Sequence, residues 1–301
     1  MAMTLIEMMK TETDPVRSGV IETLYTEETL FQYVPWETVQ GLALPYTSEV
    51  ELPGVAFRKL NQAFAESTGV INREVETLKP FGGDSDTDKV LVDAYGNTRR
   101  AINDRMYAKA MAVKYVKTML YGNSPASRAG ASYDDPLGFD GLQARCTSGQ
   151  TLDAGGSTGT DGSSVFAIRF GDGYCQGLQT PQGVDARDLG EIDAKPVYRT
   201  RIDQTAGLAV YNGRAVAWIK DLRAATSVLT WQLMDQLVDL IDGEPTVIVM
   251  SKRSRQQLKA SCLGAGVHLA TILDQLGRPI RAWDTVPIII SDAIIDGETN
   301  S

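Results

Sequence analysis

The sequence predicts an α+β fold in which one long segment has no core of its own to pack against. Three observations predict it. Residues 39–60 and 70–81 alternate polar and apolar side chains, as strands do. Residues 98–121 repeat apolar side chains every three or four positions, as an amphipathic helix does. Short apolar segments and two further helical patterns follow from residue 165, so we expect the compact core in the C-terminal two thirds.

The chain begins with two short amphipathic helical patterns, at residues 4–10 and 16–33. Pro15 follows Asp14, which places a proline in a first helical turn directly after a capping residue. Two short helices that precede an isolated ribbon form no core alone. We therefore expect them to act as an arm.

The two alternating segments predict a long two-stranded ribbon, with small and turn-prone residues between them. Pro45 and Pro53 favour edge strands, because proline cannot donate a hydrogen bond to a neighbouring strand. One face of the first segment holds Tyr46, Ser48, Val50 and Leu52, and the other holds Thr47, Glu49 and Glu51. A two-stranded ribbon with little to pack on is marginal in water. We therefore expect another copy of the chain to stabilise it.

The long helix is expected over residues 98–121, because Asn97 or Thr98 can cap it and Gly122 can end it. Its predicted buried stripe consists of Ile102, Met106, Ala110, Val113, Val116 and Leu120. The opposite side is basic and carries Arg99, Arg100, Arg105, Lys109, Lys114 and Lys117. These cations would attract nucleic-acid phosphates or acidic residues of a neighbouring copy.

The body of the protein is predicted from residue 124 onward. Residues 153–164 are rich in glycine, serine and aspartate, which is typical of a surface loop. Strand-like segments occupy 165–170, 197–202, 207–211, 215–219, 246–250 and 287–290. An amphipathic helix is expected at 227–241 and a basic helix at 253–262. The sequence contains no internal repeat.

Composition narrows the class of protein. A hydrophobic share of 43% with 22% charged residues is ordinary for a folded, soluble chain. Residues 1–90 hold seven Lys and Arg against 15 Asp and Glu, so −8 of the net charge of −9 belongs to the arm and ribbon. This acidity disfavours nucleic acid as the partner of the arm and ribbon and favours a complementary protein surface. We therefore expect the basic side of helix 98–121 to pair with acidic residues of a neighbouring copy rather than with DNA. The N-terminus has no signal-peptide pattern and no apolar run reaches ~20 residues, so we expect synthesis in the cytoplasm and no membrane.

The sequence gives little support for catalysis or metal binding. His268 is the single histidine, which argues against a Ser-His-Asp, Cys-His or multi-histidine site. Three widely spaced cysteines suggest buried, reduced thiols rather than disulfides or zinc. Asp84, Asp86 and Asp88 imitate the start of a calcium loop, but the later positions fail, so we expect a solvated acidic turn. The glycine clusters at 155–162 and 171–177 lack a phosphate-loop ending and are predicted turns.

An arm, a ribbon, a long helix and an α/β body follow one another in this chain. This order resembles that of the Hong Kong 97-type major capsid proteins of tailed phages, and the residues resemble the gp seven-like major capsid protein family over nearly the whole chain. The stretches that carry the resemblance are T-L-I-E-M-M-K (4–10), G-V-I-E (19–22), L-P-G-V-A-F-R-K-L-N (52–61), A-E-S-T-G-V-I-N (65–72), G-G-D-S-D-T-D (82–88), G-F-D-G-L-Q-A-R (138–145), S-V-F-A-I-R-F-G (164–171), D-L-G-E (188–191), Y-R-T-R-I-D-Q-T-A-G-L-A-V (198–210) and G-R-P-I-R-A-W-D-T-V-P-I-I-I-S-D-A-I (277–294). Each is weak alone, but their common order is specific; the short spacing from D-L-G-E to Y-R-T-R suggests a trimmed loop.

The resemblance implies roles for segments rather than for catalytic atoms. Residues 1–35 correspond to an N-arm along a neighbour, and 36–90 to an extended E-loop hairpin that lies across an adjacent subunit. The remaining assignments are a spine helix near 97–122, a peripheral domain at 91–124 and 190–222, and an axial domain at 125–189 and 223–301.

The expected function is that of a major capsid protein, which self-assembles into hexamers and pentamers of an icosahedral phage head around double-stranded DNA. No catalysis, cofactor or metal is implied. Expected partners are other copies, a portal, scaffolding or decoration proteins, and DNA bound without sequence specificity. The location is the virion, after synthesis and assembly in the host bacterial cytoplasm. An encapsulin-like nanocompartment shell is the first alternative, and an α/β hydrolase is a more remote one.

Charged residues on the ribbon and the long helix are the candidate contacts between subunits. They are Arg58, Lys59, Arg73, Glu74, Glu76, Arg99, Arg100 and Arg105. Each exposed ion pair contributes only about 0–1 kcal/mol, so repetition over a closed shell gives such contacts their effect. Lys79 and Lys89 are candidates for the lysine–asparagine cross-link of some members of this fold, but the sequence does not favour that chemistry.

Overall fold

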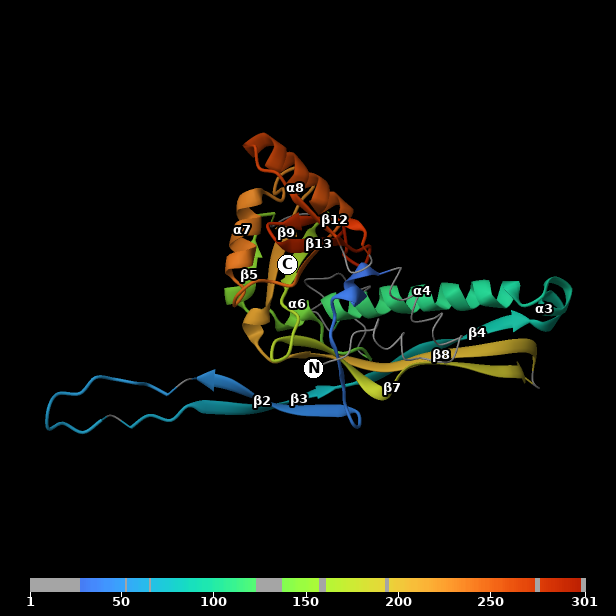
Figure 1. Ribbon diagram of the computed structural model, residues 1–301, viewed down its shortest axis with the longest axis horizontal. Helices are drawn as coiled ribbons and strands as arrows, with labels where there is room; N and C mark the ends of the chain where they lie inside the picture. Colours follow the sequence, from blue (N-terminus) through green and yellow to red (C-terminus); the bar gives the residue numbers. More distant parts are fainter. Residues whose placement is uncertain are drawn as a thin grey trace.

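The computed structural model describes residues 28–51, 53–64, 66–122, 137–156, 161–192, 195–273 and 277–298. Its strands form a four-stranded sheet of order β1-β7-β8-β4, a seven-stranded sheet of order β11-β12-β13-β10-β6-β9-β5, and a two-stranded ribbon of β2 and β3. The ribbon projects from one side of the body, and the long helix α4 projects from the opposite side (Figure 1). The α+β class predicted from the sequence is confirmed.

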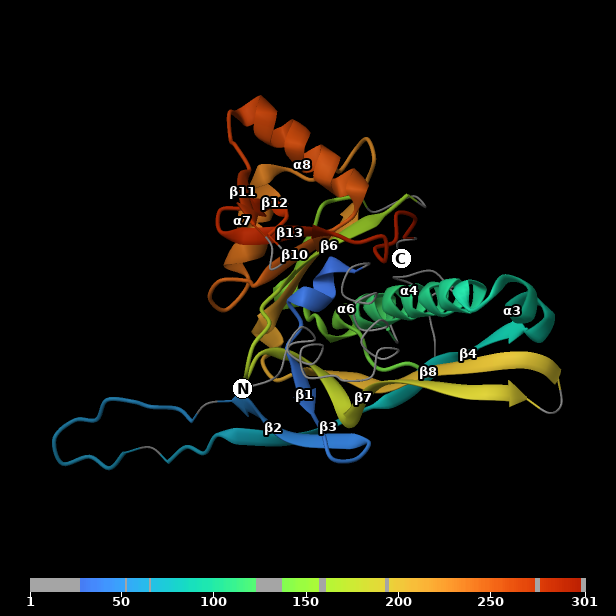
Figure 2. The same ribbon diagram turned by 45° about the vertical axis from the view of Figure 1, so that its right-hand side comes forward.

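The four-stranded sheet carries the long helix. Its strands are β1 (Trp36–Thr38), β7 (Cys175–Ile192), β8 (Lys195–Val210) and β4 (Lys79–Asp88), and β1 is the only one parallel to its neighbour. Helix α4 (Thr98–Tyr121) lies along β4 and β8, with the short helix α3 (Lys89–Tyr95) at its outer end (Figures 1 and 2). The predicted helix bounds are confirmed.

The buried side of α4 differs from the predicted stripe. Val116 and Leu120 are buried as expected, but Ile102 and Met106 are 50% and 64% exposed. The side that faces the sheet instead holds Ala108, Met111, Ala112, Tyr115, Val116, Met119 and Leu120. The stripe is shifted because small alanines let the helix approach the sheet and because Tyr115, rather than Ala110, enters the core. The outer half of the helix lies beyond the core, so its apolar residues stay exposed.

An aromatic cluster surrounds Tyr115. Its ring centre lies 5.2 Å from that of Trp36, 5.4 Å from Phe31, 5.9 Å from Phe81 and 5.6 Å from Phe139. The Tyr115 hydroxyl donates a hydrogen bond to the carbonyl oxygen of Gly207 at 3.1 Å, which satisfies its polar end inside the core.

Residues 28–36 are part of this core. They contain the 3₁₀ turn η1 (Thr29–Gln32), and Leu30, Phe31, Val34 and Trp36 are all buried. Trp36 pairs in register with Gly177 of β7. The last eight residues of the predicted arm, 28–35, therefore belong to the core and are not a free limb. The rest of the arm lies outside the described residues, and so do the helix predicted at 4–10 and most of the helix predicted at 16–33.

The seven-stranded sheet forms a second layered core. It consists of β5 (Thr151–Asp153), β6 (Ser163–Ile168), β9 (Val216–Leu222), β10 (Val247–Met250), β11 (Ala270–Leu273), β12 (Pro279–Trp283) and β13 (Val286–Ile290). Helices α7 (Trp231–Asp239) and α8 (Lys252–Ala265) pack with it around Leu237, Ile248 and Leu258. The remaining short turns are α6 (Leu142–Arg145), η2 (Ser148–Gln150) and η3 (Gly213–Ala215).

Two strands depart from the sequence expectation. The segments predicted at 197–202 and 207–211 are one continuous strand, β8, whose partner β7 was not predicted. Glycine, proline and charged residues are scattered along β7, and its pairing with β8 is interrupted between Gln179 and Val184. Such a strand has no continuous alternation for a sequence pattern to reveal.

Candidate assembly surfaces

The ribbon is an isolated hairpin, as predicted. Strands β2 (Ala43–Glu51) and β3 (Val70–Thr77) pair with each other from Ala43↔Thr77 outward and with no other strand among the described residues. All residues of β3 except Glu76 are exposed. The chain from 53 to 64 and from 66 to 69 extends the ribbon beyond its paired part (Figure 1).

A polar network fixes the base of the ribbon to the body. Arg145 forms a two-pronged ion pair with Glu76, one prong being Nη2 to Oε2 at 2.8 Å. Burial lowers the pKa of Arg145, but the hydrogen bonds and charge of Glu76 outweigh it, so the pKa is raised overall. The guanidinium therefore stays charged and the contact is charge-assisted.

Two tyrosines extend this network. The Tyr46 hydroxyl donates to Glu74 Oε2 at 2.7 Å, and the Tyr211 hydroxyl donates to Glu37 Oε2 at 2.5 Å. The two rings meet edge to face, with centres 5.0 Å apart. Burial and the neighbouring carboxylates raise the pKa of both hydroxyls, so they remain donors over the physiological range. Sequence reasoning identified Glu74 and Glu76 but not their internal partners.

The acidic run on β4 is a strand, not the solvated turn that we predicted. Asp84 is paired with Arg201 through two hydrogen bonds of 2.7 and 2.9 Å, and Asp86 with Arg199 through two of 2.6 and 2.7 Å. The alternating Ser85 and Thr87 are buried beneath α4. The hydrogen bonds of Arg201 hold the pKa of Asp84 below its usual range. Asp88 caps α3 by accepting from the Val90 amide at 2.8 Å, so this run is structural.

The candidate contact residues divide into two groups. Glu76 is bound inside its own chain, and so is Arg100, which donates to Thr200 Oγ1 at 2.9 Å and forms an ion pair with Asp188. Arg58 lies over the Phe64 ring, 4.8 Å from its centre, and Arg99 lies 5.7 Å from that of Tyr95. Within the described ranges, Lys59, Arg73 and Arg105 form no side-chain ion pair or hydrogen bond. The second group thus consists of Arg58, Lys59, Arg73, Arg99 and Arg105, whose charges are not paired with a carboxylate among the described residues and remain available to another partner.

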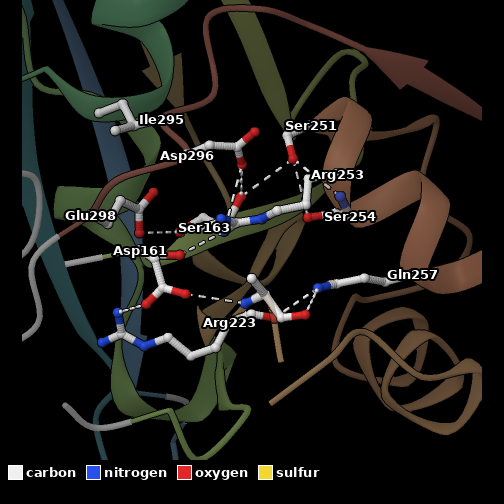
Figure 3. Close-up of polar contacts among 12 residues, drawn as sticks. Asp161, Ser163, Arg223, Ser251, Arg253, Ser254, Gln257, Ile295, Asp296 and Glu298 are labelled. Atoms are coloured by element: carbon white, nitrogen blue, oxygen red, sulfur yellow. Dashed lines mark hydrogen bonds and ion pairs between the residues drawn. The ribbon is translucent and has the colours of Figure 1, made fainter. Parts of the chain in front are cut away.

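A partly buried polar cluster, shown in Figure 3, fastens the C-terminal segment. Glu298 accepts hydrogen bonds from Tyr121 at the end of α4 (2.8 Å) and from Ser164 of β6 (2.6 Å). Ser163 donates to Asp296 Oδ1 at 2.7 Å, and Arg223 donates to Asp161 Oδ1 at 2.7 Å. Burial raises the pKa of Glu298 to about 7, although its two hydroxyl donors act in the opposite direction.

The structure offers no reactive constellation among the residues that it describes. No serine or cysteine there donates a hydrogen bond to His268, and no three metal-binding side chains gather. Cys146, Cys175 and Cys262 are free and buried, as predicted. No helix of the described part is both long and apolar enough to cross a bilayer.

An apolar cavity of about 420 Å³ opens between α4 and β4. Phe81, Tyr107, Met111, Tyr115 and Phe139 line it, with Lys79 and Lys114 also contributing. A second hollow is lined by Pro80–Gly83 and by Asp84, Arg201 and Asp203, whose side chains alternate with those that face α4 and so lie on the other face of the sheet. The sequence analysis did not identify this groove, since its walls come from three distant segments.

The profile of the family described as "Major capsid protein GP7" matches residues 13–301. The chain belongs to this major capsid protein family. The capsid protein of bacteriophage epsilon15 is similar in structure, with a TM-score of 0.61 and 20% identity over 88% of this chain and 86% of that one. This likeness shows that the capsid protein described here has the Hong Kong 97-type fold, as the resemblance implied.

Two weaker structural likenesses have TM-scores below 0.5. The SrpI encapsulin of Synechococcus elongatus PCC 7942 gives 0.48 with 12% identity, over 66% of this capsid chain and 88% of that one. The procapsid of bacteriophage JBD30 gives 0.45 with 11% identity, over 84% and 89%. No curated protein sequence matches the chain.

Proposed function

We propose that copies of this major capsid protein form the hexamers and pentamers of an icosahedral phage head that encloses double-stranded DNA. The observation that carries the proposal is a hairpin that pairs with no other strand of the described residues, in a chain of a capsid family. An isolated two-stranded ribbon is marginal in water. Its burial against neighbouring copies supplies the apolar contact that one chain lacks.

The segment roles follow from the same proposal. Residues 1–27 serve as the N-arm, and the outer ribbon serves as the E-loop across an adjacent subunit. The four-stranded sheet with α4 serves as the peripheral domain, and the seven-stranded sheet with α7 and α8 as the axial domain. β1 and β4 flank the ribbon in sequence, but both belong to the four-stranded sheet. β7 belongs to that sheet as well. The functional E-loop is therefore shorter than 36–90.

Unpaired charges define the proposed contacts of the ribbon and spine helix with neighbours. Arg58, Lys59, Arg73, Arg99 and Arg105 are the candidates that remain after Glu74, Glu76 and Arg100 are assigned inside the chain. Such exposed pairs set register and orientation more than affinity. A portal, scaffolding or decoration proteins and packaged DNA are the further partners, and the protein is made in the host cytoplasm and has no catalytic role.

Recombinant expression in bacteria followed by sedimentation and electron microscopy tests the proposal. Closed shells, or rings of five and six subunits, are the expected particles. A protein that stays monomeric at every concentration would contradict the assembly role. Nucleic acid in shells from phage-infected cells supports the head, whereas shells of one small size that carry an enzyme would favour the encapsulin-like alternative.

A further inference from the structure

A hollow of about 520 Å³ lies between α8 and β12, in the part of the molecule built on the seven-stranded sheet. Four basic side chains line it: Arg255 and Lys259 from α8, His268 from the turn after that helix, and Arg281 from β12. No carboxylate of the described residues lines it. In a chain with a net charge of −9, a basic hollow of this kind indicates an anionic ligand. We call it the α8–β12 hollow.

The fold of α8 and its last turn brings three of these groups together. Arg255 and Lys259 are four positions apart, so their side chains lie on the same side of the helix. The helix ends at Gly266, whose φ of 72° is left-handed and whose amide donates back to the Cys262 carbonyl. Glycine adopts this conformation without strain. The reversal returns the chain toward the helix and places His268 at the hollow.

The guanidinium of Arg281 is held in place by the neighbouring strand. Its Nη1 donates to Thr271 Oγ1 at 2.8 Å, and the two residues lie opposite each other in the pairing of β11 with β12. In the part of the chain that the structure describes, the other N–H groups of this guanidinium have no partner. A guanidinium that is already oriented loses less side-chain freedom when it binds an anion.

The cations of the hollow are not neutralised within the chain. Lys252, in the first turn of α8, pairs with Asp292 at 2.8 Å. Arg255 and Lys259 form no ion pair within the described ranges, and α8 itself contains no acidic residue. Like charges one helical turn apart repel each other. An anion between them would offset this repulsion.

The number of basic groups favours phosphate over carboxylate as the ligand. A carboxylate carries one charge on two oxygens, whereas a phosphate monoester carries up to two charges on three oxygens. Arginine binds phosphate oxygens in a two-pronged geometry, and lysine adds a compact point charge. The volume of the hollow lies within the ~300–1,000 Å³ range of small-molecule sites, so a single phosphate group does not exhaust it.

We propose that the α8–β12 hollow is a phosphate-binding site, in which Arg255, Lys259 and Arg281 bind the phosphate oxygens. The imidazole of His268 supplies a further hydrogen bond. The phosphate groups have two sources, the backbone of nucleic acid and free oligophosphates. The nucleic-acid source rests on the proposed function, since a shell around DNA brings its backbone to the subunit, whereas the site itself needs no assembly. Helix α8 lies at the end of the body away from the ribbon, so the ligand leaves the ribbon free (Figures 1 and 2).

Removal of two cations tests the site. Titration calorimetry of the full chain with pyrophosphate should show at least tenfold weaker binding for K259Q/R281Q than for the unmodified protein. Both side chains are exposed, so the temperature of unfolding without ligand should not change. R99Q/R105Q removes two exposed cations from α4 and is the matched control, with an affinity within twofold of the unmodified chain. Equal affinity of K259Q/R281Q and the unmodified chain would overturn the site.

A second control separates the charge of Arg281 from its hydrogen bond. T271A removes the bond between β11 and β12 but keeps the cation, and it should retain most of the affinity for pyrophosphate. If T271A loses as much affinity as K259Q/R281Q, the loss comes from the hairpin and not from a charged site. A glutamate-rich peptide represents an acidic protein segment. If it binds the hollow more tightly than pyrophosphate does, the phosphate assignment is wrong.

A short DNA duplex distinguishes the two sources of phosphate. If the hollow binds the backbone, K259Q/R281Q lowers the affinity for the duplex in fluorescence anisotropy, and pyrophosphate competes with it. The slope of log affinity against log salt concentration should also become shallower, by about 0.9 for each lost phosphate contact. If binding of pyrophosphate requires the hollow but binding of the duplex does not, the site stands with free oligophosphate as its ligand.

These outcomes distinguish the phosphate site from the proposed function. If the chain forms shells but pyrophosphate binds K259Q/R281Q as tightly as the unmodified protein, the site is wrong and the capsid role stands. If the chain forms no oligomer yet binds pyrophosphate through the hollow, the capsid role fails and the site stands.

Discussion

Arg145 and Glu76 form an ion pair where the ribbon joins the body, with side chains 19% and 14% exposed. The pair links α6 to β3, which are separated by 69 residues of sequence at this point. The ribbon is thus attached at its base, while its two strands pair only with each other among the residues that the structure describes. A neighbour therefore receives a limb with a set direction rather than a loose loop.

Loss of this ion pair should loosen the ribbon. Arg145→Ala leaves Glu76 partly buried with only the Tyr46 hydroxyl as a donor and no cation. Removal of one partner from a fully buried pair costs about 3–5 kcal/mol, so we expect about 2 kcal/mol here because both side chains are partly exposed. Amide hydrogen exchange should show faster exchange over β2 and β3 than in the wild type. Arg187→Ala, which breaks a more exposed pair with Asp185, is the control and should change little. Unchanged exchange of the ribbon in Arg145→Ala would show that the pair does not hold it.

Stability should fall as the pH rises through about 7, because of Glu298. Burial raises the pKa of this carboxyl to about 7, so the folded protein favours its neutral form. The corresponding stabilisation is complete below the pKa of the unfolded chain and is lost as the pH rises through the folded value. At ~1.4 kcal/mol for each pKa unit, the loss approaches about 3 kcal/mol above pH 8.

Urea unfolding of the variant Glu298→Gln between pH 5 and 9 measures this effect. The glutamine keeps the shape but cannot ionise, so its unfolding free energy should depend less on pH and exceed that of the wild type at pH 8. Glu66→Gln, at an exposed position on the ribbon, is the matched control. An identical pH profile for wild type and Glu298→Gln would refute the assignment to this carboxyl.

Trp36→Ala should destabilise the body, not merely the arm. Trp36 is 1% exposed and packs on Phe31 and Tyr115, and large-to-small substitutions of buried aromatic residues cost about 3–5 kcal/mol. Chemical denaturation of the unassembled protein checks this value. Leu42→Ala, six positions later and 62% exposed, should change the unfolding free energy by less than about 0.5 kcal/mol. Equal effects from the two variants would mean that residues 28–36 do not belong to the core.

Removal of the ribbon's outer part should separate folding from assembly. Replacement of residues 53–69 by a short turn keeps β2, β3 and every strand of the two body sheets. We expect the thermal unfolding of the body to be unchanged and shells to be absent in electron micrographs. Deletion of all of 39–90 is a poorer experiment, because it also removes β4 and the buried Leu78. Intact shells from the shortened protein would disprove a role of residues 53–69 in assembly.

The sequence predicted those parts of the fold in which local pattern and tertiary position agree. The bounds of α4 follow from its own periodicity and from Gly122, and the ribbon follows from alternation beside turn-prone residues. The orientation of α4 could not be predicted in this way. It depends on which side chains the sheet accepts, and the small Ala108 and Ala112 proved more important than the larger Ile102.

The candidate surfaces were predictable to a similar degree. Charges on the ribbon were visible in the sequence, but their internal partners were not, because Arg145 reaches Glu76 only through the fold. The acidic run of β4 was misread as a turn because Asp84 and Asp86 are stabilised by arginines of β8 more than 100 residues later. The groove between α4 and β4 likewise has walls from separate segments, so no local motif marks it.

Helix α4 has its inner half in the aromatic core and its outer half clamped to the sheet by the Arg100–Thr200 and Asn103–Thr87 contacts. It therefore behaves as a lever about 36 Å long, at 1.5 Å per residue. Because these contacts join α4 to β4 and β8, a rotation of roughly 10° about Tyr115 would move the helix and these strands together and carry α3 through several ångströms. A closed shell contains positions of different curvature. A tilt of α4 and its strands as one rigid unit would fit a subunit to each position without refolding.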